Sequence, residues 1–204
     1  IAFGNVNLLS IQTEPLKVIN EGSGWLEIEG IEVLDDEGAF WASSDPYSLI
    51  GDEEWTLSVS FAPIAEALQD AILRITSNAV DSPVVDVPLD GAGVRPVLDV
   101  LPTALHFDTS EDASTESQTV VLESTGSGPV LLTELDIIED DTGAYSVEIP
   151  AAVSLPYVLD PGLSIEVTVT HEPVIGESYQ AYLHIYSNDL NDEDQTVTLS
   201  ASGT

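Results

Sequence analysis

The chain has 204 residues, of which 37 are Asp or Glu and three are Lys or Arg, so its formal net charge is −34. This charge argues against a nucleic-acid-binding protein and against docking on anionic membranes, because both need a basic surface. Hydrophobic residues nevertheless make up 43% of the sequence, which indicates a folded protein rather than a disordered acidic chain.

The chain contains two copies of one unit. With an offset of 104 residues, positions 20–24 align with 124–128; beyond position 40 the offset becomes 110, and 73–78 align with 183–188. The second copy carries about six extra residues near 147–155, and the first has no counterpart of 97–103. Units of this length predict tandem domains, residues 1–93 and 94–204, with the opening strand of the first domain truncated.

Each copy is built from short alternating segments. Apolar residues alternate with polar ones in the first copy over 16–18, 55–61, 73–75 and 85–89, and in the second over 120–122, 165–169 and 197–201. Turn residues separate these segments, and 64–71 is the only candidate helix in the first copy. The pattern predicts an all-β chain of two tandem immunoglobulin-like β-sandwich domains with about seven strands each.

Several aligned positions also resemble a known family. They are Ile1-x-Phe3-Gly4 and Leu105-x-Phe107-Asp108, Asn20-x-Gly22 and Ser124-x-Gly126, Phe61-Ala62-Pro63, Tyr157 to Gly162, and Ser187-Asn188-Asp189. This pattern resembles the Hydin-like (ASH) domains and the bacterial choice-of-anchor D repeats, relatives of the major sperm protein fold. The resemblance implies tandem modules of large proteins, ciliary or centrosomal in eukaryotes and secreted or surface-anchored in bacteria, and it supplies no catalytic residue.

The sequence gives no basis for a catalytic or cofactor-binding site. There is no Cys, which excludes disulfides, thiol nucleophiles and Cys-based zinc sites. The three histidines, His106, His171 and His184, are scattered, and with 37 carboxylates some pair will match any catalytic spacing by chance. We therefore expect a protein that is not an enzyme.

Calcium is the metal that the sequence best accommodates. Asp189, Asn191, Asp192 and Asp194 cluster in one turn, and hard oxygen ligands suit Ca²⁺. The cluster does not fit the EF-hand template, because Asp194 stands where that loop needs Gly. The alternative interpretation is a solvated acidic turn.

The best candidate for a contact patch is a set of outward aromatic residues on one predicted strand. Tyr182 and Tyr186 alternate with core positions and flank His184. The alternative is that they are ordinary strand-forming residues that pack on their neighbours.

We predict a non-enzymatic structural or adhesive module of a larger secreted or cell-surface repeat protein, which spaces its neighbours and contacts a protein, a glycan or adjacent repeats. The alternatives are a calcium-stiffened adhesin and an intracellular scaffold module. The acidity fits a halophilic or marine surface protein, since self-repulsion between carboxylates is screened at high salt. A surface dressed with divalent cations and a docking face for a basic partner remain alternatives.

Overall fold

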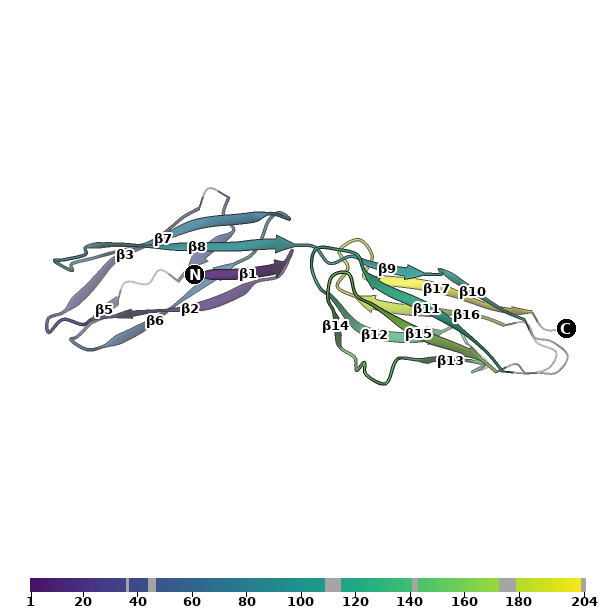
Figure 1. Cartoon of the computed structure of the whole chain (residues 1–204). Helices are drawn as coiled ribbons and strands as arrows, with labels where there is room; N and C mark the ends of the chain where they lie inside the picture. The colour runs from purple at the N-terminus through teal and green to yellow at the C-terminus, as the bar shows by residue number, and fades with distance from the viewer. Residues whose placement is uncertain (36, 44–46, 109–114, 141–142, 173–178, 203–204) are drawn as a thin grey trace. The chain divides into compact units, whose positions relative to one another are not determined.

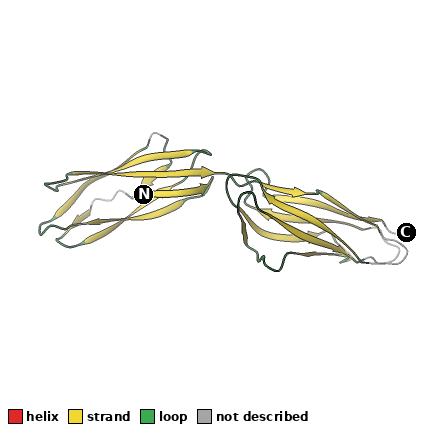
Figure 2. Cartoon of the chain, in the orientation of Figure 1, coloured by secondary structure: helices red, strands yellow, loops and turns green. Residues whose placement is uncertain are grey.

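The computed structural model describes residues 1–35, 37–43, 47–108, 115–140, 143–172 and 179–202. The chain divides into two compact units, Ile1–Val94 and Arg95–Thr204, one residue later than the predicted boundary. Both units are built of strands (Figures 1 and 2). No helix in the described ranges is long and apolar enough to cross a membrane.

The first unit pairs a five-stranded sheet with a three-stranded one. The larger sheet has the order β1 (Ala2–Asn7), β8 (Val84–Val94), β7 (Leu68–Ser77), β3 (Leu26–Leu34) and β5 (Tyr47–Leu49). The smaller has the order β2 (Gln12–Ile19), β6 (Glu54–Phe61) and β4 (Phe40–Ala42). β1 runs parallel to β8, and the other pairs are antiparallel.

The second unit repeats this topology with one additional strand. Its five-stranded sheet has the order β10 (Ala104–Asp108), β17 (Asp194–Ser202), β16 (Tyr179–Ser187), β12 (Val130–Ile138) and β14 (Tyr157–Leu159). Its second sheet has four strands, β13 (Tyr145–Glu148), β15 (Ser164–His171), β11 (Glu116–Ser124) and β9 (Leu98–Leu101). The additional strand is β9, which pairs with the outer side of β11.

Matched hydrogen bonds show that the two units share one framework. The side chain of Asn78 accepts from the amide of Glu27 at 2.9 Å, and that of Asn188 accepts from Leu131 at 2.7 Å. The same turn closes the smaller sheet of each unit. In the first unit the amide of Asp52 donates to the carbonyl of Asn20 at 2.8 Å, and in the second the amide of Gly162 donates to the carbonyl of Ser124 at 2.8 Å. The prediction of tandem β-sandwiches is therefore confirmed.

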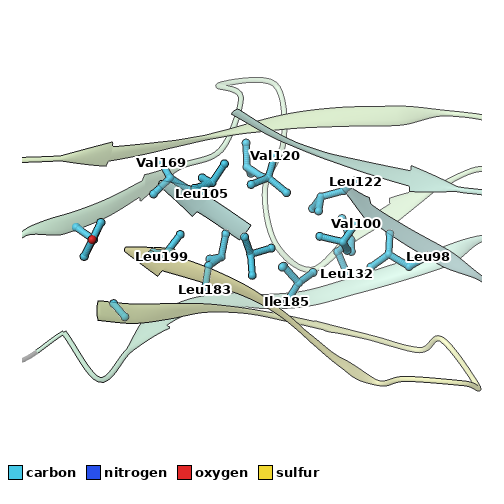
Figure 3. Packing of buried hydrophobic residues seen from close by; sticks show 14 of the residues in the cluster. Leu98, Val100, Leu105, Val120, Leu122, Leu132, Val169, Leu183, Ile185 and Leu199 are labelled. Carbon is cyan, nitrogen blue, oxygen red and sulfur yellow. The ribbon is translucent and has the colours of Figure 1, made fainter. Parts of the chain in front are cut away.

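The alternating segments supply the cores. In the first unit Leu57, Val59 and Phe61 of β6 are fully buried, as are Val167 and Val169 of β15 in the second. Figure 3 shows the interior of the second unit, where Leu98 and Val100 of β9 lie beside Leu122 and Leu132 at one end of the core; all four are buried. β9 thus completes a sheet and also fills that end of the sandwich.

Two details of the predicted fold are wrong. The described residues form eight strands in the first unit and nine in the second, rather than about seven, because short strands such as β4, β5 and β14 carry no alternation long enough to recognise. The candidate helix at 64–71 is instead a run of bends that leads into β7 at Leu68, because β7 needs its full length to pair with β8.

Candidate functional site

The predicted calcium cluster lies in the turn between β16 and β17, and its first residue is buried. Asp189 is 2% exposed. Its Oδ2 accepts a hydrogen bond from the amide of Leu98 at 2.7 Å, and its Oδ1 accepts one from the amide of Asn191 at 2.8 Å. The side chain of Gln195 donates to the carbonyl of Leu98 at 2.6 Å. Asp189 and Gln195 therefore hold the first residue of β9 by both of its backbone groups.

The other members of the cluster bond to different partners. Arg95 Nη2 donates to Asn191 Oδ1 at 2.5 Å, and Asp194 Oδ1 lies 2.7 Å from His184 Nδ1 on the outer face of the sheet. Asp192 is exposed. In the described part of the chain, no group of three or more His, Cys, Asp or Glu residues is arranged to hold a metal ion. Calcium binding at this turn stays a prediction.

The predicted contact patch is a row of three aromatic side chains on the outer face of β16, an aromatic strip made of Tyr182, His184 and Tyr186. These three side chains are half-buried rather than fully exposed. β16 lies between β12 and β17 in the sheet, so strands flank it on both sides. The rings of His184 and Tyr186 are stacked, with centroids 5.9 Å apart, and Gln180 Nε2 donates to the Tyr182 hydroxyl at 2.8 Å. The role of this strip as a contact patch stays a prediction.

Carboxylates surround this strip. In the register of β12 against β16, Asp136 lies opposite His184 and Glu134 lies opposite Tyr186. From β17 on the other side, the Asp194 carboxylate contacts the His184 ring. Burial raises the pKa of the Tyr186 phenol, and the charges of Asp194, Glu134 and Asp136 raise it further. Aromatic faces beside carboxylates form a surface suited to cationic groups.

The remaining histidines lie elsewhere in the second unit. His171 is 1% exposed and packs against the rings of both Phe107 and Tyr145, at centroid distances of 5.6 and 4.7 Å. Burial lowers the pKa of its imidazole, and the nearby charges of Asp140 and Glu116 offset this only in part. His106 Nδ1 lies 3.1 Å from Ser200 Oγ at the surface. The three histidines are thus in three separate environments.

Sequence analysis missed a groove in the first unit. It has a volume of about 570 Å³ and is lined by the end of β2, the start of β3 and the turn from β7 to β8. Its lining includes Trp25, which is 67% exposed, Val80, which is 95% exposed, and Val85, which is 45% exposed. No local pattern points to it, because its lining comes from segments far apart in the sequence, around Val18, Trp25 and Val80.

Residues 1–85 match the ASH family, described as Abnormal spindle-like microcephaly-assoc'd, ASPM-SPD-2-Hydin. This match assigns an ASH domain to the first unit, as the aligned motifs predicted. Residues 86–204 lie outside the match, so the resemblance of the second unit to the same family stays a prediction. No curated protein matches the sequence.

Solved structures with a similar fold are distant in sequence. A protein of unknown function from Porphyromonas gingivalis W83 is 16% identical, with a TM-score of 0.44 over 97% of this chain and 93% of that one. The ASH/PapD-like domain 7 of human CEP192 is 16% identical, with a TM-score of 0.41 over 52% of this chain and 84% of that one. The CsuC–CsuE chaperone–tip adhesion subunit complex of Acinetobacter baumannii is 10% identical, with a TM-score of 0.35 over 98% of this chain and 96% of that one.

Proposed function

We propose that this chain, whose first unit matches the ASH family, is a non-enzymatic structural and contact module of a larger secreted or cell-surface protein. Its two sandwiches space neighbouring parts of that protein, and its outer faces contact a partner. The observation that carries the proposal is the aromatic strip Tyr182, His184 and Tyr186, which is framed by carboxylates on the outer face of β16.

The contacts that several polar side chains make within the fold support a structural role. Asp189 holds β9, His171 packs inside the core, and Asp194 bonds to His184. Asp140 accepts hydrogen bonds from the amides of Ala144 and Tyr145, at 3.1 and 2.8 Å, and so fixes the start of β13. These groups stabilise the fold by hydrogen bonding and packing, which is what a scaffold requires of them.

The geometry of the strip favours a cationic partner. A Lys or Arg side chain of a protein partner can stack on the tyrosine rings while its charge approaches Glu134, Asp136 or Asp194. The formal charge of −34 attracts such a partner over a longer range at low ionic strength and leaves the strip to provide the specific contact.

Binding of the labelled full chain to arrays of basic peptides and of glycans tests the proposal. We expect binding to Lys- or Arg-containing peptides that falls about tenfold or more in the double variant Tyr182→Ala/Tyr186→Ala. The matched control is Ile72→Ala/Thr76→Ala, which changes the equivalent positions of β7 in the first unit. Equal binding by both double variants would contradict the contact patch, and turnover of a glycoside or ester substrate would contradict the non-enzymatic role.

A further inference from the structure

We infer that the outer face of the smaller sheet in the first unit binds a neutral, β-linked polysaccharide chain. The sugar rings stack on the indole of Trp41 and hydrogen-bond to the hydroxyl groups beside it. This face belongs to the first unit and is independent of the aromatic strip on β16, so the two proposals fail separately.

The face presents an exposed tryptophan at the strand β4. Trp41 is 42% exposed, whereas Phe40, the residue before it, is buried in the core. In the sheet register Trp41 lies opposite Ser60 of β6, and Ser60 lies opposite Thr13 of β2. Neighbouring strands lie about 4.8 Å apart, so this row extends about 10 Å and is wide enough for a disaccharide. A further strand beside β2 would widen the face without covering Trp41, because β6 and β2 lie in between.

Hydroxyl groups line the sheet beside this tryptophan. Thr13 Oγ1 and Ser60 Oγ lie 2.8 Å apart and share a hydrogen bond. Ser58 and Thr56 are exposed further along β6, and the amide of Ser43, the residue after β4, donates to the Ser58 carbonyl at 3.2 Å. A hydroxyl both donates and accepts hydrogen bonds, and an indole offers a flat apolar surface to the C–H face of a pyranose ring. The face therefore supplies both kinds of contact that hold an uncharged sugar.

The equivalent face of the second unit differs in both respects. The strand registers align Trp41 with Ser146, so the second unit has no aromatic ring at this position. Three exposed carboxylates of the second unit have neutral counterparts in the first: Glu123, Glu148 and Glu166 correspond to Ile19, Ser43 and Thr56. The same framework thus carries an acidic face in one unit and an aromatic, hydroxyl-rich face in the other.

Charge complementarity selects a neutral partner for this face. The outward positions of β2, β4 and β6, all of them in the described ranges, carry one cation and one carboxylate, Lys17 and Glu54. These two neutralise each other, since Lys17 Nζ lies 2.9 Å from Glu54 Oε1. A cationic partner finds no free carboxylate there, and an anionic polymer or a second copy of the chain is repelled by the formal charge of −34. A neutral polysaccharide is subject to neither effect.

The probes are hexasaccharides of β-linked glucose, mannose or xylose, each titrated into the ¹⁵N-labelled full chain. The indole N–H groups of Trp25, Trp41 and Trp55 give one signal each, because the chain has three tryptophans. We expect the Trp41 signal to shift with at least one of these sugars, with a Kd below about 2 mM. The affinity should be unchanged in about 1 M NaCl, since no charge on the sugar is screened.

Substitutions locate the site. Trp41→Ala should weaken binding at least about tenfold, and Trp41→Tyr, which keeps an aromatic ring, should weaken it less. The matched control is Trp25→Ala, at a tryptophan of the same unit that is 67% exposed, and it should leave binding unchanged. Ser58→Ala/Thr56→Val removes two exposed hydroxyls and should weaken binding about threefold or more. The remaining indole signals report whether each variant is folded.

Four results would overturn the inference. Absence of any shift of the Trp41 signal at about 10 mM of each sugar would show that the face is not a glycan site. Equal binding by Trp41→Ala and the unmodified chain would place the sugar elsewhere. Tighter binding of an oligogalacturonate of the same length, lost in about 1 M NaCl, would contradict selection for a neutral chain. A shift of the Trp41 signal with rising protein concentration alone would assign the face to a second copy.

Discussion

The rings of Tyr145 and His171 lie 4.7 Å apart in the core of the second unit, at the positions where Phe40 and Phe61 lie 4.5 Å apart in the first. Each pair joins the last residue of a long strand to the first residue of the strand beside it. The third ring is Phe107 in one unit and Phe3 in the other. A titratable imidazole therefore replaces a phenyl ring inside an otherwise equivalent aromatic cluster.

The first prediction concerns pH. Because burial lowers the pKa of His171, the unfolded state takes up a proton more readily than the folded state below the ordinary histidine pKa of about 6.5. The stability that depends on this group is present above that pH and is lost as the pH falls toward 5. We expect His171→Phe to stabilise the second unit relative to the unmodified chain more at pH 5 than at pH 7.

Urea unfolding at both pH values, followed by tyrosine near-ultraviolet circular dichroism, measures this difference. All three tryptophans lie in the first unit, so tryptophan fluorescence provides an internal reference. His106→Asn, at an exposed histidine of the same unit, is the matched control. An identical pH dependence in His171→Phe and the unmodified chain would show that His171 does not contribute.

The second prediction concerns Gly91 on β8. A Cβ atom at this position would overlap the ring of Phe61. In the second unit the equivalent residue is Ala201, and the residue equivalent to Phe61 is His171, whose ring is smaller. We expect Gly91→Ala to destabilise the first unit by roughly 1–3 kcal/mol through overpacking. Tryptophan fluorescence during urea unfolding measures this change, and the added substitution Phe61→Leu should recover part of it. Unchanged stability of Gly91→Ala would contradict the packing described for Phe61.

The third prediction concerns the attachment of β9. Asp189→Ala leaves the amides of Leu98 and Asn191 without their acceptor, so we expect a loss of about 3 kcal/mol from the second unit. Asp189→Asn keeps an acceptor oxygen and should cost less. Asp192→Ala, at an exposed position in the same turn, should change stability by less than about 0.5 kcal/mol. Equal losses of stability in Asp189→Ala and Asp192→Ala, measured by urea unfolding, would show that Asp189 does not attach β9.

The fourth prediction concerns calcium. Because Asp189 and Asp194 already bond to the amide of Leu98 and to His184, we expect millimolar Ca²⁺ to raise the Tm of the second unit no more than Mg²⁺ does. Calorimetry with and without EDTA measures this. A rise specific to Ca²⁺ that is reversed by EDTA and lost in Asp192→Asn/Asp194→Asn would instead support the calcium-stiffened adhesin.

The fifth prediction concerns salt. The formal charge of −34 makes the compact state repel itself, and the Debye length falls from about 10 Å at 0.1 M salt to about 3 Å at 1 M. We expect the Tm of both units to rise between low salt and about 2 M NaCl, and to rise equally in KCl. At pH 4 the effect should shrink, because many carboxylates are then protonated. A Tm independent of salt at pH 7 would argue against salt adaptation and favour a basic partner as the reason for the acidity.

The buried positions that could be predicted correctly are those set by the alternation of neighbouring apolar and polar residues. Leu57, Val59 and Phe61 alternate with polar residues, and this period alone puts them on the buried face of a strand. Tyr182, His184 and Tyr186 follow the same period, so their common outward face could be predicted from spacing. Their partial burial could not, because it depends on the side chains of β12 and β17, which the sequence does not place beside β16.

What the sequence by itself determined is the all-β fold, the tandem repeat and the interior positions, since strand periodicity and turn residues act over a few neighbouring positions. Only the tertiary structure decided that Asp189 is a buried attachment point for Leu98, 91 residues earlier in the chain. It also decided that the end of β2, the start of β3 and the turn from β7 to β8 line one groove. Both depend on which strands lie next to each other, and this is fixed by the packing of the two sheets rather than by any local pattern.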